Sequence, residues 1–183
     1  MALLPWTNHV AAGSEFLRGW KSCTVIGTPG DDLSLLGSPG RDVICGRGGD
    51  DKIKGLGGHD LIRGGEGNDI LIGGEGDDRI VGGRGEDQAY GRDGVDQMLG
   101  GRGDDILEAD DGSDVAHGGL GADSLYGTDG EDVLRGGAGN EHCMWARDGE
   151  AGDAVFGGPG RDRGRADAND SENSVELHPA CWS

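Results

Sequence analysis

The chain has 183 residues, enough for one domain, with 41 glycines, 4% aromatic residues and a formal net charge of −19 from 35 acidic and 16 basic side chains. These values describe either a disordered chain or one that a positive partner completes, because the apolar surface is too small to offset the entropy of ordering. The charge makes nucleic acid and anionic membranes poor partners and cations good ones. No apolar run reaches the roughly 18 residues of a membrane span.

The N-terminal segment, residues 1–26, precedes the repeats described below. It contains two tryptophans together with Phe16 and Leu17. We expect it to cap the open end of the repeats, as the ends of repeat proteins require. It is a poor signal peptide, because it lacks a basic n-region and its apolar run ends at Trp6. An export signal is therefore not evident in this segment.

A nine-residue repeat begins at Gly27 and runs through thirteen consecutive units, of which only the first is ten residues long. The three units from Gly64 read GGEGNDILI, GGEGDDRIV and GGRGEDQAY. Position four is glycine in all thirteen units, position eight is usually apolar, and position six is acidic, with Glu141 in the last unit. The aspartates at position six are Asp32, Asp42, Asp51, Asp60, Asp69, Asp78, Asp87, Asp96, Asp105, Asp114, Asp123 and Asp132.

This pattern predicts an all-β fold, a parallel β-roll (β-solenoid) with two repeats in each coil. Positions one to six, rich in Gly and Asp, are expected to form a turn, and positions seven to nine a short strand whose middle residue points inward. Coils of 18 residues then stack as parallel strands about 4.8 Å apart around one thin core. Leu35 and Cys143 are expected at the core position of the first and last units. At two units per coil, thirteen units make about seven coils.

After Met144 the frame slips by three residues and the repeat becomes degenerate. The predicted domains are therefore an N-terminal cap over 1–26, the repeats over 27–165, and a C-terminal cap or tail over 166–183.

Stacked coils would place the position-six carboxylates in two columns, one along each edge of the roll. Like charges 5 Å apart repel by roughly 0.8 kcal/mol in water and by more at lower dielectric, so the columns need counterions. Carboxylates and turn carbonyls are the oxygen ligands that suit Ca²⁺, and the chain has no His/Cys cluster at zinc spacing. About ten Ca²⁺ ions, one in each slot between successive turns, would bring a charge of +20 against the net charge of −19 of the chain.

The predicted calcium ligands are the twelve aspartates and the turn glycines that let the backbone approach an ion. We expect the strongest sites from Asp51 to Asp87 and weaker ones at Asp96 and Asp114, where the units depart from the pattern. The predicted turn glycines are Gly46, Gly49, Gly55, Gly58, Gly64, Gly67, Gly73, Gly76, Gly82, Gly85, Gly100 and Gly103.

Four cysteines allow three pairings. The spacing between Cys23 and Cys45 is close to the length of one coil plus an offset, so a Cys23–Cys45 disulfide would staple the first coil. A Cys143–Cys181 disulfide would tie the C-terminal segment to the last regular unit. The alternative is four free thiols in a reducing compartment.

The units match the GGxGxDxUx nonapeptide and resemble the RTX, or haemolysin-type calcium-binding, repeat proteins. The resemblance covers about residues 27–144 and implies a right-handed parallel β-roll that binds Ca²⁺ between its turns. It also implies an exported, extracellular protein whose repeats fold in calcium.

The chain offers no HExxH zinc motif and no GxSxG nucleophile elbow, and repeats occupy most of it, so we expect no enzyme activity. The expected function is a calcium-binding structural module whose protein or surface partner the sequence does not identify. The alternative is a ligand-binding or adhesion surface for a cell, ice or a host, carried on the calcium-loaded roll. Ile70, Ile72, Tyr90, Leu99 and Tyr126 are the candidates for an exposed apolar patch there.

Overall fold

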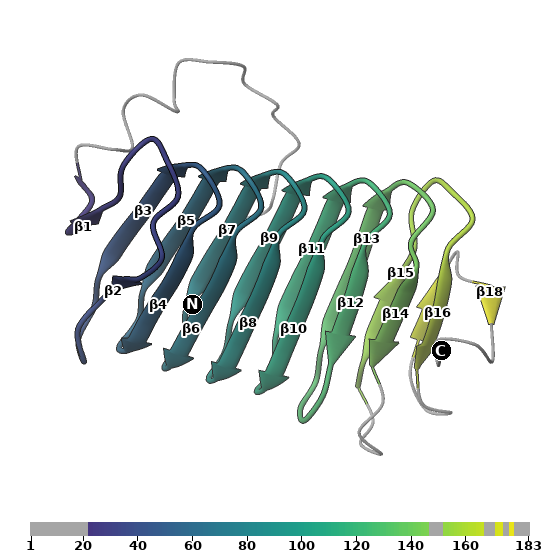
Figure 1. Cartoon of the computed structure of the whole chain (residues 1–183). Coiled ribbons are helices and arrows are strands. Elements are labelled where there is room, and N and C mark those ends of the chain that lie inside the picture. The colour runs from purple at the N-terminus through teal and green to yellow at the C-terminus, as the bar shows by residue number, and fades with distance from the viewer. Residues whose placement is uncertain (1–21, 147–151, 167–170, 174–175, 178–183) are drawn as a thin grey trace.

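The computed structural model describes residues 22–146, 152–166, 171–173 and 176–177. These residues form two parallel β-sheets of nine strands each, stacked face to face (Figure 1). The chain passes from one sheet to the other after every strand, so odd-numbered strands make one sheet and even-numbered strands the other. We call these sheet A and sheet B. No helix in the described residues is long and apolar enough to cross a membrane.

The strands follow one another at nearly constant intervals. Sheet A contains β1 (Val25–Ile26), β3 (Val43–Gly48), β5 (Leu61–Glu66), β7 (Arg79–Arg84), β9 (Gln97–Arg102), β11 (Val115–Leu120), β13 (Val133–Ala138), β15 (Ala154–Phe156) and β17 (Ser171–Asn173). Sheet B contains β2 (Leu35–Leu36), β4 (Lys52–Gly57), β6 (Ile70–Glu75), β8 (Gln88–Asp93), β10 (Ile106–Asp111), β12 (Ser124–Gly127), β14 (Cys143–Ala146), β16 (Arg163–Ala166) and β18 (Glu176–Leu177).

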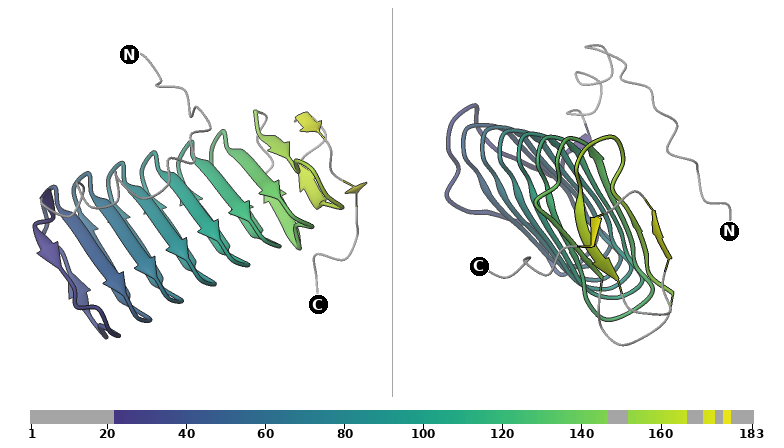
Figure 2. Two further views of the ribbon diagram at one scale, coloured as in Figure 1. Left: turned by 90° about the horizontal axis from the view of Figure 1, so that it is seen from above. Right: turned by 90° about the vertical axis from the view of Figure 1, so that its right-hand side faces the viewer.

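The register between neighbouring strands confirms the predicted β-roll with two repeats per coil. Ile62 of β5 pairs with Ile80 of β7, and Ile80 pairs with Met98 of β9, so each partner is the equivalent residue two units further along the chain. Figure 2 shows the coils stacked along one axis, with the end-on view on its right.

A single line of apolar side chains between the sheets forms the core. The position-eight residues of both sheets are buried, including Ile62 and Leu71 at 0% exposure, because alternate residues of a strand point to opposite faces. Leu35 packs against this core as predicted. The prediction for Cys143 is wrong: Met144 takes the core position and pairs with Leu125. Met144 comes one place later than the period of the regular coils requires, so one extra residue is inserted in front of β14.

The regular strands are twice as long as predicted. β7 continues through the glycine pair Gly82–Gly83 and ends at Arg84, at position three of the next unit. The prediction that positions one to three belong to the turn is therefore wrong. These residues still meet the equivalent residues of the next coil, so the parallel ladder continues, and only positions four to six turn the chain.

Beyond β14 the sheets continue with a wider spacing. Val133 of β13 pairs with Ala154 of β15, which comes later than the regular period requires and so accommodates the three-residue slip seen in the sequence. Most of the predicted N-terminal cap and of the predicted tail lies outside the described residues, so the division into domains remains a prediction.

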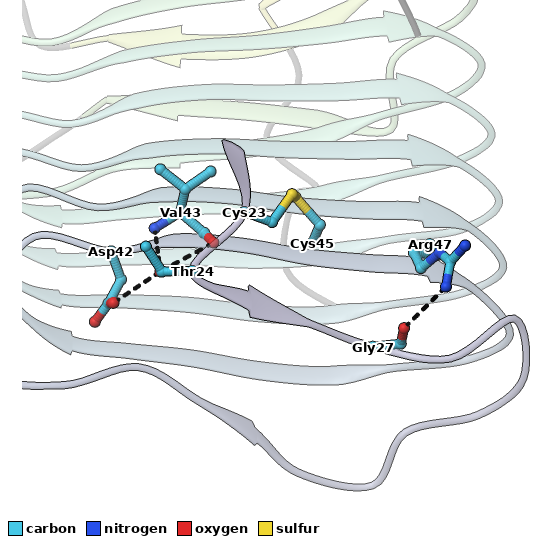
Figure 3. The surroundings of a disulfide bond; sticks show 7 residues. All are labelled: Cys23, Thr24, Gly27, Asp42, Val43, Cys45 and Arg47. Atoms are coloured by element: carbon cyan, nitrogen blue, oxygen red, sulfur yellow. Dashed lines mark hydrogen bonds between the residues drawn. A yellow bond between two sulfur atoms is a disulfide. The ribbon is translucent and has the colours of Figure 1, made fainter. Parts of the chain in front are cut away.

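The first coil is stapled as predicted: Cys23 and Cys45 form a disulfide (Figure 3). Next to it, the Thr24 hydroxyl donates to Oδ1 of Asp42 at 2.9 Å, and the Val43 amide donates to the Thr24 hydroxyl at 2.9 Å. Cys143 is also disulfide-bonded. Cys181, its predicted partner, lies outside the described residues.

Removing the first disulfide should destabilise the roll. The variant with Cys23→Ser and Cys45→Ser opens the loop that this bond closes around the first coil. For a loop of this length we expect a cost of about 3 kcal/mol of unfolding free energy. Denaturant unfolding in calcium would measure the loss. An unchanged midpoint would show that the hydrogen bonds of Thr24 hold the first coil without the disulfide.

Candidate metal centres

The predicted carboxylate columns are present, one along each edge of the roll. We call the edge that carries Asp51 the first edge and the edge that carries Asp60 the second edge. The column side chains from Asp51 to Asp132 are at most 3% exposed, although carboxylates are rarely buried without a partner. Both columns lie at the turns that connect the two sheets, because position six ends each turn.

One oxygen of each buried carboxylate, Oδ1, accepts a hydrogen bond from a backbone amide of the preceding coil. Oδ1 of Asp69 accepts a hydrogen bond of 2.8 Å from the amide of Asp51, one coil earlier, and Asp69 donates its own amide to Oδ1 of Asp87 at 2.9 Å. The same bond joins successive aspartates along both columns at 2.7–2.9 Å. Each carboxylate therefore ties its own turn to the previous one.

The second oxygen, Oδ2, accepts no such hydrogen bond at most of these positions. Oδ2 is buried and accepts no hydrogen bond in the part of the chain that the structure describes at most column positions, among them Asp51, Asp60, Asp69, Asp78, Asp87, Asp96, Asp105, Asp114 and Asp123. A buried polar atom without a hydrogen bond costs about 1–3 kcal/mol, and more when it is charged. The repetition of this cost along both columns indicates that a cation belongs beside these oxygens.

The pKa values of the column carboxyls reflect the same burial. Loss of solvation raises the pKa of Asp69 to about 7 and that of Asp114 to about 8, and the charges of neighbouring column members contribute to both rises. The hydrogen bond from the preceding coil opposes this rise in each case. Without a cation, the folded columns would thus retain protons near neutral pH.

The first members of the two columns differ from the rest. Oδ2 of Asp32 accepts the amide of Thr28 at 2.6 Å, and Oδ2 of Asp42 accepts the amide and the hydroxyl of Ser38. The bonds from Ser38 lower the pKa of Asp42. In these two units, a Thr or Ser at position two donates a hydrogen bond to Oδ2 of the aspartate at position six.

The glycines at position one make room for the unpaired oxygen. A Cβ on Gly64 would overlap Oδ2 of Asp69 and lie 2.9 Å from the carbonyl oxygen of Gly82 in the next coil. Carboxylate and carbonyl oxygens thus converge on the space above each of these glycines. Such oxygens are the ligands that a hard cation such as Ca²⁺ prefers.

The glycines at position four are needed for a different reason. Gly67 has a φ of 119°, which residues with a side chain rarely adopt. Its Cα also faces the carbonyl of Gly49 in the previous coil so closely that a Cβ would overlap that oxygen. Position four therefore requires glycine both for the turn and for the close stacking of turns.

Replacing Gly64 with alanine should damage the site without touching a carboxylate. The new methyl group would displace Asp69, and we expect a loss of about 1–3 kcal/mol from overpacking together with weaker calcium binding. Gly57→Ala is the matched control, because its Cβ would meet its nearest neighbour, Glu75, at an ordinary 3.7 Å. Equal calcium binding by both variants, measured by calorimetry, would contradict this account of position one.

The two edges differ at position two. From Gly65 to Gly137 the first edge has glycine there, whereas the second edge carries Leu56, Arg92 and Asp110 in the left-handed region, with φ of 86°, 84° and 67°. Nη1 of Arg92 lies 3.6 Å from Oδ2 of Asp110, one coil further on. The units that contain Asp96 and Asp114 depart from the repeat pattern in the sequence. Their irregular residues at position two, Arg92 and Asp110, both lie on the second edge.

Sequence reasoning missed two members of the columns, Asp153 and Asp162. Both are at most 2% exposed. Oδ1 of Asp153 accepts the amide of Asp132 at 2.8 Å, so this aspartate continues the second edge. Asp162 follows Glu141 on the first edge. Their position six within the degenerate units DGEAGD and GGPGRD was the available signal.

A second ladder of hydrogen bonds, also missed, runs outside each column at position five. Oδ1 of Asp50 accepts the amide of Asn68 at 2.8 Å, and Oδ1 of Asn68 accepts the amide of Glu86 at 2.8 Å. On the second edge, Nδ1 of His59 accepts the amide of Asp77 at 2.9 Å. These exposed side chains connect the turns without using the buried carboxylates.

The described residues contain no group of three or more His, Cys, Asp or Glu side chains that could hold an ion together. Each turn contributes one buried carboxylate, so any further ligands at these sites must come from backbone carbonyls and from the adjacent turn. This arrangement suits Ca²⁺, which takes six to eight oxygen ligands, better than zinc, whose sites are built mainly from His and Cys side chains.

Comparison with known proteins agrees with this interpretation. The family model of the RTX calcium-binding nonapeptide repeat matches the chain in four copies, over residues 24–53, 36–71, 72–107 and 108–140. A search of curated proteins finds no match to the chain. The family matches cover the coils in which the carboxylate columns are most regular. The chain therefore belongs to the family of RTX calcium-binding nonapeptide repeat proteins.

Proposed function

We propose that this protein is a module that folds when calcium ions bind between its turns. The observation that carries the proposal is the repeated Oδ2 atom, buried and without a hydrogen bond in the described coils. Ions placed beside these atoms would remove the repulsion within each column and the cost of burying the charges. Binding and folding are then one process, because the sites exist only when coils are stacked.

The proposed ligands are the predicted aspartates and turn glycines, with Asp153 and Asp162 added to the two columns. About ten ions, one in each good slot between successive turns, would nearly cancel the net charge of −19. We expect the sites at Asp32 and Asp42 to be weaker, because their own turns already supply hydrogen bonds to the carboxylates.

The proposed setting is extracellular, and the proposed role is structural. The family to which the chain belongs binds calcium, and calcium sites of weak affinity are typical of extracellular modules. The Cys23–Cys45 disulfide supports the same setting, because disulfides persist in oxidising compartments. The module would stiffen or display whatever it is joined to, and we propose no enzyme activity for it.

A calcium titration followed by far-UV circular dichroism, starting in EDTA near pH 8, tests the proposal. We expect a cooperative gain of β-structure at micromolar to millimolar Ca²⁺ and no comparable gain with Mg²⁺, which demands stricter octahedral geometry. A β-signal that is complete in EDTA and unchanged by calcium would overturn the proposal that calcium drives folding.

The five candidates for an apolar patch do not form one surface. Ile70 is the first residue of β6 in sheet B. Ile72 of β6, Tyr90 of β8 and Tyr126 of β12 point outward from the same sheet, in one row that Glu108 interrupts. Leu99 of β9 belongs to sheet A, on the opposite side of the roll. None of the five is among the strongly exposed apolar side chains of the described residues.

A further inference from the structure

The first coil leaves apolar side chains uncovered at one end of sheet B. Among the described residues β2 is the last strand at this end, with a neighbour, β4, on one side only (Figure 1). Leu35 of β2 is half-buried, whereas Ile53, the equivalent core residue of the next coil, is 0% exposed. Leu33 and Leu36 are 84% and 51% exposed. An uncovered end of this kind is where a repeat protein needs a cap.

Backbone groups face the same free side. In a regular coil, the amide of the first strand residue bonds to the previous coil, as the Ile70 amide does to the Asp51 carbonyl at 2.8 Å. Successive peptide groups of a strand alternate in direction. The Gly37 amide donates to the Lys54 carbonyl of β4 at 2.8 Å, so the Leu36 amide, one residue earlier, points away from β4.

The carboxylate column of the first edge stops at the same coil. Oδ1 of Asp51 accepts the amide of Asp32 at 2.8 Å, in the pattern of all regular column members. Oδ2 of Asp32 accepts the amide of Thr28. No amide among the described residues donates to Oδ1 of Asp32, so this oxygen is one hydrogen bond short of the column pattern.

The N-terminal segment contains a stretch with the signature of a repeat unit. Residues 13–19 read GSEFLRG, and the equivalent stretches of two regular units read GHDLIRG (58–64) and GEDVLRG (130–136). The shared features are a first glycine, an acidic residue two places later, an apolar residue four places later and a closing glycine. In the N-terminal stretch these are Gly13, Glu15, Leu17 and Gly19. The matches of the family model begin at residue 24 and do not include it.

The spacing places this stretch one coil before β2. Gly19 precedes Gly37 by 18 residues, Gly37 precedes Gly55 by 18, and Leu17 precedes Leu35 by 18. The segment 19–26 is one residue shorter than a regular unit, and the unit 27–36 is one residue longer, so the two irregularities offset each other. The N-terminal stretch is therefore in register with sheet B.

We propose that residues 10–18 form a further, degenerate repeat unit that stacks on β2 and closes this end of the core. Leu17 covers Leu35, and residues 16–18 add one strand to sheet B. The Leu36 amide then donates to the Leu17 carbonyl, and the Glu15 amide donates to Oδ1 of Asp32. The free side of β2 is thus a docking surface for a segment of the same chain.

The attachment of this segment favours it over other occupants. The Cys23–Cys45 disulfide and the hydrogen bond from Thr24 to Asp42 fix the chain to sheet A a few residues after Gly19. A second copy of the chain has no such tether, and its own first-coil aspartates would face those of the first copy. The proposal goes beyond calcium binding and does not depend on which ion occupies the columns.

Amide hydrogen exchange followed by NMR, with calcium present, tests the proposal. We expect the Leu36 amide to be protected in the parent protein. Leu17→Asp should speed its exchange at least about tenfold and leave the amides of β7 unchanged, because only the end of the roll opens. Phe16→Asp is the matched control, since it adds the same charge at a residue that points outward in the proposed strand. Fast exchange of Leu36 in the parent, or equal acceleration by both substitutions, would overturn the proposal.

A pair of introduced cysteines tests the register. Arg18→Cys with Leu36→Cys should form a disulfide within one chain, because equivalent residues of adjacent strands lie about 4.8 Å apart and a disulfide spans about 4.4–6.8 Å between Cα atoms. Phe16→Cys with Leu36→Cys is the matched control, about 8 Å apart and two residues out of register. Mass spectrometry of peptides from the oxidised protein identifies the bond. Equal yields from the two pairs would contradict the register, and a covalent dimer joined through these cysteines would make a second copy the occupant.

Discussion

Asp69→Asn should raise the calcium concentration at the folding midpoint at least tenfold, or about 1.4 kcal/mol. Asparagine keeps the oxygen that accepts the Asp51 amide but removes the negative charge at the buried Oδ2. Asp69 stands between Asp51 and Asp87 in its column, so two adjacent slots lose a ligand. We expect calorimetry to count fewer ions per chain.

The same substitution should have the opposite effect without metal. It removes a buried charge that burial and its column neighbours disfavour, so whatever β-structure the protein retains in EDTA should become more stable. Asp69→Ala also removes the hydrogen bond from the Asp51 amide. We therefore expect this variant to bind less calcium and to gain no stability in EDTA. Comparing the two variants separates the ligand role of Asp69 from its role in tying turns together.

Asp50→Asn is the matched control for Asp69→Asn. It makes the same change of charge on the same edge, at an exposed side chain whose Oδ1 accepts the Asn68 amide and which asparagine can replace. We expect its calcium midpoint to stay within about twofold of the parent. If Asp69→Asn bound the full complement of calcium with the parent midpoint, sharing of each carboxylate by two slots would be wrong.

In EDTA, acidification from pH 8 to pH 5 should stabilise the roll. Burial holds the pKa of Asp87 at about 6, of Asp69 at about 7 and of Asp114 at about 8, all above the ordinary 3.8. Between about pH 4 and pH 8 the folded chain therefore binds more protons than the unfolded chain, and the unfolding free energy falls as pH rises. Protons would take the place of the missing cations.

Circular dichroism against pH in EDTA would show this as a gain of β-structure with a midpoint between about pH 6 and pH 8. The control is 1 M salt at pH 8, which screens exposed charges beyond about 3 Å and leaves buried ones largely unaffected. Full recovery of structure in salt alone would assign the instability to surface repulsion and contradict the role of the buried columns. Calcium added near pH 6.5 should release protons into a weakly buffered solution.

Much of this architecture could be predicted because each unit repeats the same residue types at the same positions. A glycine pair, an aspartate five residues after the first glycine and an apolar residue at position eight define a coil without any knowledge of distant contacts. The Cys23–Cys45 disulfide followed from the length of one coil. The prediction of the core residue failed where the spacing changed: the inserted residue before β14 moved Met144 into the core in place of Cys143.

The sequence by itself determined the nine-residue period, the two sheets, the row of buried position-eight side chains and the two carboxylate columns. These features depend only on residues one or two units apart. Tertiary structure decided how each carboxylate is used: Oδ1 ties the Asp69 turn to the Asp51 turn, while Oδ2 remains buried beside Gly64. It also decided that the strands extend through the glycine pairs. Such features depend on the register between coils and on which way side chains point, and these are fixed only when the coils stack.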